Sequence, residues 1–400
     1  MLLIRAGWFR CAALMALLAL AGCRTAPPSL DGIAEGYVRA ALQLAQHQPS
    51  LVDGFHGPDE WRPGAREPVA GIRARIASLR SQLAAARQGG DDLRAAYLDG
   101  QLGALDLAAR RLLGETFPFA DEVRLALGVT WTPPAADELA SHRQALESLL
   151  PGAGPLVDRY RAFRREAALP DTAIEQTFAD ALETCRAVTR AHLALPAGER
   201  VTLAWVDQGP WEAYARDAGG LATEIRVARG GAPTAAHVAH VACHEGYPGH
   251  HVQHVLIATA LVADRGWLEF TLAPAFGPHL LVAEGAAEAG ARLALGEAAA
   301  TDRATAIEAA VAGLDQAIPP IVAAYLDGEL GTEAAAARLA DEALVPDPEG
   351  FLVFAERARA RAVAYPIGRR LVAAALERDG PGDQWARLAA LFSDTPFHLE

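Results

Sequence analysis

The chain has 400 residues and a formal net charge of −13, with 36 basic against 49 acidic side chains. This acidic excess argues against nucleic acid as a partner, because phosphates bind to basic surfaces. A chain of 400 residues buries a sizeable core and often forms two or three domains. Composition excludes little else about the substrate.

The N-terminus has the layout of a secretion signal. A basic start and a short apolar run, 11–20, precede the sequence Leu-Ala-Gly-Cys that ends at Cys23. The run is too short for a comfortable membrane span. Leu-Ala-Gly-Cys resembles the bacterial lipobox, in which the cysteine is lipidated and becomes the first residue. We therefore expect a signal peptide at 1–22 and a lipidated tether at 23–30; the alternative is a plain secretory signal.

Helical periodicity dominates the segment that follows, which we predict as an N-terminal helical half, 31–195. Apolar residues at Ile72, Ile76 and Leu83 fall on one stripe of a predicted helix. Predicted helices lie, in chain order, at 31–46, 69–86, 93–113, 135–149, 153–167 and 171–195.

A small β element is predicted next, at the start of a second half, 196–400. Val201 and Trp205 belong to an alternating strand pattern at 200–206, and a second strand is predicted at 223–227. Thr234 suits the N-cap of the helix that comes after it. The β element is either a structural hairpin or an edge that pairs with a substrate backbone.

The most informative stretch runs from His244 to His251 and reads His-Glu-Gly-Tyr-Pro-Gly-His-His. Six of the twelve histidines fall between His237 and His254. A hydrolytic zinc needs three protein ligands, an open position for water and a nearby carboxylate that takes a proton. In a helical His-Glu-x-x-His motif the two histidines share one face and the glutamate is the base. We therefore predict His244 as a Zn²⁺ ligand and Glu245 as the general base.

Pro248 stands where that motif has its second histidine, so the second ligand is ambiguous. Proline and the glycine after it disfavour a straight helix. A kink would bring His250 to the ligand position, whereas a straight helix would place His251 on the face of His244, since seven residues make about two turns. We assign His250 as the ligand and expect His251 to contact a ligand or the substrate.

The third ligand is predicted on a later helix, within the apolar, alanine-rich segment 278–295. Glu284 and Glu288 stand four residues apart and share one helix face. Buried carboxylates are costly unless they are paired or bind a metal. Glu284 is therefore predicted to bind zinc and Glu288 to orient a ligating histidine; an ion pair between Glu284 and Arg292 is the alternative.

We make simpler predictions for several other side chains of the second half. Cys243 is expected to be a small buried residue, with a disulfide to Cys185 or a reactive thiol as alternatives. Four further histidines are expected to be structural or supporting: His237, His240, His254 and His279. Four late arginines are expected mostly on a solvated helix face, one of them suited to a substrate carboxylate: Arg359, Arg361, Arg369 and Arg370. Helices are predicted at 301–327, 332–343, 349–376 and 383–392, with a break at Pro319-Pro320.

The motif His-Glu-x-x-Pro-Gly-His-His resembles the signature of the domain-of-unknown-function 885 family, bacterial zinc-peptidase-like proteins that include many lipoproteins. Glu284-Gly285 and the segment from Tyr365 to Gly368 match two later motifs of that family. The resemblance implies a mainly α-helical, gluzincin-like peptidase fold with a small antiparallel β element beside the metal helix. It also implies zinc bound by His244, His250 and Glu284, Glu245 as base and Tyr365 as a hydrogen-bond donor to the oxyanion.

These observations favour a zinc metallopeptidase that cleaves peptides in the bacterial cell envelope. The lipid on Cys23 would anchor it to the membrane on the periplasmic side. Two other hypotheses stay open: a zinc-binding lipoprotein without catalysis, and an inactive peptidase-like scaffold. Metal content and hydrolysis of a peptide library separate the three.

Overall fold

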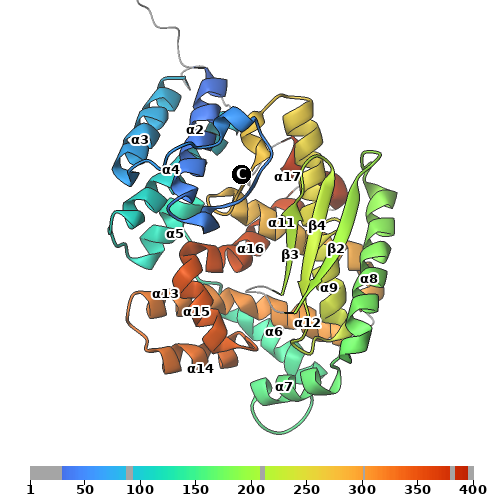
Figure 1. The fold of residues 1–400 in the computed structure, drawn as a ribbon. Coiled ribbons are helices and arrows are strands. Elements are labelled where there is room, and N and C mark those ends of the chain that lie inside the picture. The colour runs from blue at the N-terminus through green and yellow to red at the C-terminus, as the bar shows by residue number, and fades with distance from the viewer. Residues whose placement is uncertain (1–28, 87–92, 208–211, 301, 379–382, 395–400) are drawn as a thin grey trace, which may run out of the picture.

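The computed structural model describes residues 29–86, 93–207, 212–300, 302–378 and 383–394. The predicted signal peptide and Cys23 lie outside the described residues. Within the described ranges the protein is mainly helical and carries two small β-sheets, as the sequence predicts (Figure 1).

The N-terminal helices form one packed group, drawn in blue and teal in Figure 1: α2 (Leu30–Ala45), α3 (Val69–Ala86), α4 (Leu93–Leu112) and α5 (Phe119–Leu127). The predicted apolar stripe of α3, including Ile72, Ile76 and Leu83, is buried in their shared core. Strand β1 (Val52–Phe55) follows α2 and pairs antiparallel with the distant β5 (Leu272–Pro274). Helical periodicity did not indicate α5, because nine residues are too few for a pattern.

Three helices lead to the main sheet: α6 (Ala136–Leu149), α7 (Leu156–Glu166) and α8 (Asp171–His192). The sheet contains β2 (Arg200–Val206), β3 (Ala213–Asp217) and β4 (Ala222–Ala228) in the order β2-β4-β3. Strand β3 pairs antiparallel with β4, as expected for the element, but β2 pairs parallel with β4. The sheet is therefore mixed and not a hairpin of the two predicted strands, because the unpredicted β3 lies between them in sequence.

Four helices carry the residues of the sequence motifs, and Figure 1 shows two of them, α11 and α16, near the centre of the molecule. They are α9 (Ala235–Glu245), α10 (His250–Leu256), α11 (His279–Ala300) and α16 (Ala364–Glu377). Gly285 and Gly368 stand at the crossing of α11 and α16. A Cβ at Gly285 would lie 2.2 Å from the carbonyl oxygen of Gly368, so only glycine fits there. This close approach brings Glu284 beside Tyr365.

The predicted helices 301–327 and 349–376 are each divided in two, whereas those at 332–343 and 383–392 are observed within one residue of their predicted bounds. The remaining C-terminal helices are α12 (Arg303–Gly313), α13 (Ile318–Leu326), α14 (Thr332–Glu342), α15 (Pro348–Ala358) and α17 (Gln384–Ser393). A 3-10 turn splits α12 from α13 just before the Pro-Pro pair, and another splits α15 from α16. Among the described residues, Arg303–Leu326 is the one stretch long and apolar enough to cross a membrane. The break, and the burial of Ile307 and Ile321, fit a helix of a protein core instead.

The predicted boundary near residue 195 stays a prediction. Phe178 of α8 packs with Val238 of α9 in one core. The N-terminal core likewise includes Leu261 and Phe276 from the second half. Segments from both predicted halves therefore share cores around the site.

Candidate metal centre

The two histidine helices are separated by a sharp break, as Pro248 predicts. Thr234 caps α9 by accepting a hydrogen bond from the backbone N–H of His237, also as predicted. Helix α9 ends at Glu245 and α10 begins at His250. A Cβ at Gly249 would lie 1.7 Å from the carbonyl oxygen of His244, so glycine is required where the chain turns back. The turn places His250 next to His244.

Three donor atoms converge across α9, α10 and α11. Oε2 of Glu284 lies 3.6 Å from Nε2 of His244 and 3.4 Å from Nε2 of His250. All ligand atoms of this group lie within 4.8 Å of one another. Tetrahedral zinc with bonds of about 2.0–2.1 Å separates neighbouring ligand atoms by about 3.4 Å. The spacing therefore fits a shared metal ion, and the buried Oε2 of Glu284 accepts no hydrogen bond from the described residues.

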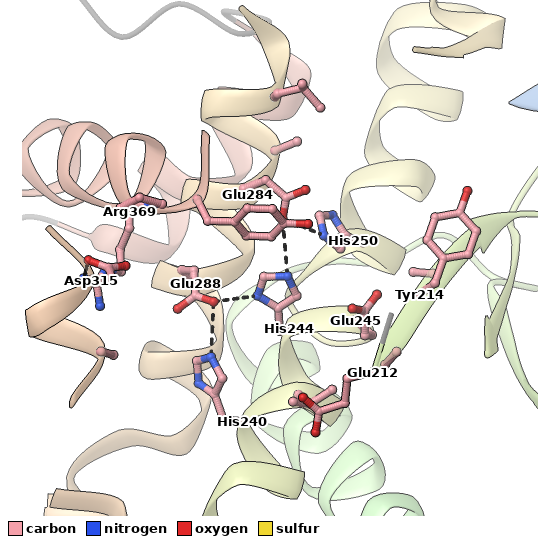
Figure 2. A pocket seen from close by; sticks show the side chains of 18 of the residues that line it. Glu212, Tyr214, His240, His244, Glu245, His250, Glu284, Glu288, Asp315 and Arg369 are labelled. Carbon is pink, nitrogen blue, oxygen red and sulfur yellow. Dashed lines mark hydrogen bonds and ion pairs between the residues drawn. The ribbon is translucent and has the colours of Figure 1, made fainter. Parts of the chain in front are cut away.

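Glu288 contacts His244 from the side opposite Glu284 (Figure 2), and its predicted role in orienting a ligand stays a prediction. Its Oε1 lies 3.1 Å from Nδ1 of His244 and 3.3 Å from Nε2 of His240. The contact with His244 meets the distance of an ion pair but not the geometry of a hydrogen bond. A carboxylate beside Nδ1 favours the ring orientation in which Nε2 points to the candidate metal position. His240 thus supports Glu288, although His240, His244 and Glu288 also satisfy the spacing of a metal-binding group.

His251 points away from the group of His244, His250 and Glu284. Its ring is fully buried, with Nδ1 2.9 Å from Oγ1 of Thr223 and Nε2 2.7 Å from Oε2 of Glu199. The geometry therefore selects His250 over His251 as the candidate ligand.

Glu199 is the centre of a buried network that sequence reasoning missed. Its side chain accepts hydrogen bonds from Tyr247 and His251, and also from Arg186 and Arg190 of α8. Tyr247 and His251 flank His250 in sequence, so this network fixes the turn between the two histidine helices. The only sequence signal was an acid just before a strand, which by itself is common.

Glu245 and Tyr365 lie on the open side of the metal group. Both line one cavity of about 1920 Å³ together with His244, His250 and Glu284. Figure 2 shows Glu245 between His244 and Tyr214 of β3. The Glu284 carboxylate, together with burial, raises the pKa of Tyr365 well above its ordinary value, so its hydroxyl stays protonated.

The histidines and glutamates of this group shift one another's pKa values. Burial alone would lower the pKa of His244, but Glu284 and Glu288 raise it well above its ordinary value. Glu284 likewise outweighs burial and raises the pKa of His250. The histidines themselves hold the pKa of Glu284 far below its usual range. A metal ion would therefore replace protons on a prearranged set of ligands.

The other histidines occupy supporting positions, as expected. His237 contacts Glu212 at 2.8 Å. His254 lies 3.2 Å from the Thr223 hydroxyl, and burial lowers its pKa to about 4. His279 contacts the carbonyl oxygen of Phe276, and burial again lowers the pKa to about 4. Neutral rings at the last two positions are consistent with structural roles.

The expectation that Cys243 is a small buried residue outside a disulfide is wrong. It forms a disulfide with Cys185, and the two Cα atoms are 5.7 Å apart. The bond ties α8 to α9 one residue before His244. Sequence could not decide this, because the pairing of two cysteines 58 residues apart depends on how α8 and α9 pack.

Comparison with known proteins supports the fold. No family model matches the chain, and no curated protein matches it. It is similar to a crystal structure described as that of "the putative lipoprotein from Colwellia psychrerythraea". The TM-score is 0.55 at 14% identity, covering 84% of this chain and 69% of that chain. This likeness shows a shared fold, and the resemblance to the domain-of-unknown-function 885 family stays a prediction.

Proposed function

We propose that the protein is a zinc-dependent metallopeptidase of the bacterial cell envelope, anchored through Cys23 and facing the periplasm. One observation carries the proposal: His244, His250 and Glu284 present ligand atoms within 4.8 Å of one another on the wall of a large cavity. The lipobox-like sequence and the lipoprotein description of the similar structure support the anchor.

His244, His250 and Glu284 would hold the ion, and Glu288 would orient His244. Zinc at this position would polarise a substrate carbonyl and make water more acidic. Glu245 then takes a proton from the attacking water and passes it to the leaving amine. One buried oxygen of Glu245, Oε2, has no hydrogen-bond partner among the described residues, which leaves it available for this transfer.

Tyr365 supplies a hydrogen bond to the substrate. Its hydroxyl is protonated, because Glu284 and burial raise its pKa. From beside Glu284 it donates to the carbonyl oxygen as that atom gains negative charge. The Gly285–Gly368 contact positions Tyr365 for this role, because it sets the separation of α11 and α16.

The shape of the cavity supports a peptide as substrate. Its volume of about 1920 Å³ is about twice the upper end of ordinary small-molecule pockets. Strand β3 is an edge of the main sheet, and Ala213 and Ala215 of β3 line the cavity. An extended peptide can add to such an edge through its backbone.

The test compares the zinc-loaded protein with Glu245→Gln. We expect the variant to bind zinc as tightly as the wild type and to lose about 10²–10⁴-fold in kcat on a mixed peptide library. Glu377→Gln is the matched control, because Glu377 lines the same cavity but lies about three helical turns after Tyr365, at the end of α16. Zinc content is measured by elemental analysis and cleavage by mass spectrometry.

Three results would contradict the proposal. Full activity of Glu245→Gln would exclude Glu245 as the base. Zinc binding without any hydrolysis would leave a metal-binding lipoprotein, and failure to bind zinc would leave an inactive scaffold.

A further inference from the structure

Arg361 lies in the same cavity as the metal group but on a different element. It belongs to the 3-10 turn Arg359–Val363 between α15 and α16, four residues before Tyr365. Four residues advance about 6–8 Å along a 3-10 or α-helical segment. Arg361 therefore projects from the wall that carries the proposed oxyanion donor.

The structure separates Arg361 from the three arginines near it. Arg359 donates to the buried Glu122, with Nη2 2.8 Å from Oε2, and Arg369 pairs with Asp315. Arg370 is exposed and, among the residues that the structure describes, contacts the carbonyl oxygen of Thr132 at 3.4 Å. The expectation of a solvated helix face is thus wrong for Arg359 and Arg369, because a buried or half-buried acid faces each of them.

The guanidinium of Arg361 is left without a hydrogen bond from the described residues. Its one ion pair there is with Asp53 of β1, at 3.9 Å between Nη2 and Oδ2, which is too long for a hydrogen bond. The side chain is 29% exposed and lines the cavity. Its donors therefore face a cavity that a ligand can enter.

A carboxylate is the group that this arrangement fits. The planar guanidinium binds a carboxylate through two parallel hydrogen bonds, and Asp53 leaves those donors unused. Every unmodified peptide carries one such group, at its C-terminus. An extended chain rises about 3.3 Å per residue, so a carboxylate on Arg361 lies one or two residues from a carbonyl beside Tyr365.

We infer that Arg361 binds the C-terminal carboxylate of the substrate, so that the protein is a carboxypeptidase-type exopeptidase. This inference rests on the proposed function. Hydrolysis adds water across the scissile C–N bond: the upstream fragment gains a carboxylate and the amine of the released fragment gains the proton from Glu245. The released fragment, of one or two residues, keeps its own carboxylate on Arg361 until it leaves.

The test measures peptide binding without cleavage. Zinc-loaded Glu245→Gln protein is titrated calorimetrically with matched five-residue peptides that end in a free carboxylate or an amide. A third, amidated peptide carries a glutamate next to its end, to separate a terminal from a side-chain carboxylate. We expect the free acid to bind roughly 10–100-fold more tightly than either amide. Adding Arg361→Gln should reduce this ratio to below about 3-fold, whereas Arg370→Gln should preserve it.

Three results would overturn the inference. Equal binding of acid and amide would exclude a carboxylate site, and equal binding of the acid and the glutamate peptide would exclude its terminal specificity. If Arg361→Gln weakens the binding of the acid and the amide peptides equally, Arg361 has only a structural role. A lowered Tm of Arg361→Gln, restored by Arg361→Lys, would corroborate that role.

Cleavage kinetics of the same acid and amide peptides distinguish this inference from the proposed function. Wild-type cleavage of both peptides at equal kcat/KM would refute the inference and support the peptidase. A binding ratio that depends on Arg361 without any cleavage would support the carboxylate site and refute the peptidase.

Discussion

Replacing Glu199 by glutamine should reveal how strongly the buried network stabilises the turn between the histidine helices. The side chain of Glu199 is fully buried. Its Oε2 accepts hydrogen bonds from Tyr247 at 2.5 Å and from His251 at 2.7 Å, while Oε1 accepts from Arg186 and Arg190. Glutamine keeps the volume of the side chain but removes its charge. Its amide N–H₂ group would also face hydrogen-bond donors, either Tyr247 and His251 or the two arginines.

The expected loss of stability follows from the pKa of Glu199. Burial alone would raise this pKa, but the hydrogen bonds from Arg190, Tyr247 and His251 lower it from 4.5 to about 2. That difference corresponds to about 3 kcal/mol of stability at neutral pH. A chain of this length has an unfolding entropy of about 0.8 kcal/mol/K, so the Tm of Glu199→Gln should fall by about 4 °C.

The direction of the pKa shift also determines how the stabilisation by Glu199 depends on pH. The folded pKa of Glu199 lies below the unfolded value, so its contribution is complete above pH 4.5 and is lost as the pH falls through 2. The difference in Tm between wild type and variant should therefore be constant above pH 5 and about half as large at pH 3.

Differential scanning calorimetry of the apoproteins between pH 3 and pH 7 measures both quantities. Glu183→Gln is the matched control, because Glu183 faces the same Arg186 at 3.5 Å but is 72% exposed. An exposed pair contributes little, so the Tm of this control should change by about 1 °C or less. Equal Tm values for the two variants at pH 7, or a deficit of Glu199→Gln that does not shrink at pH 3, would refute the reasoning.

Two further predictions concern the supports of the metal group. Glu288→Gln should lower zinc affinity about 10–100-fold, because it weakens the contact that orients His244; competition with a chelating dye measures this, and unchanged affinity would mean that Glu288 does not orient the ring. Replacing Cys185 and Cys243 together by serine should lower the free energy of unfolding by about 4 kcal/mol, since the disulfide closes a loop of 58 residues. Urea denaturation checks this value, and a loss below about 1 kcal/mol would show that the helices pack equally well without the bond.

The sequence by itself determined the elements whose pattern is local. Helical periodicity set the bounds of α3, and alternation set those of β2. Pro248 and Gly249 predicted the break in the histidine helix, because their backbone restrictions act within a few residues. The i,i+4 spacing of Glu284 and Glu288 placed both acids on one face of α11 for the same reason.

Only the tertiary structure decided which distant groups meet. The choice of His250 over His251 depends on Glu199, which comes from another element and binds His251. The disulfide depends on the packing of α8 against α9. Arg361 stands out only because Glu122 and Asp315 neutralise its neighbours while Asp53 stays 3.9 Å away. Such pairings join residues far apart in sequence, and no local pattern records them.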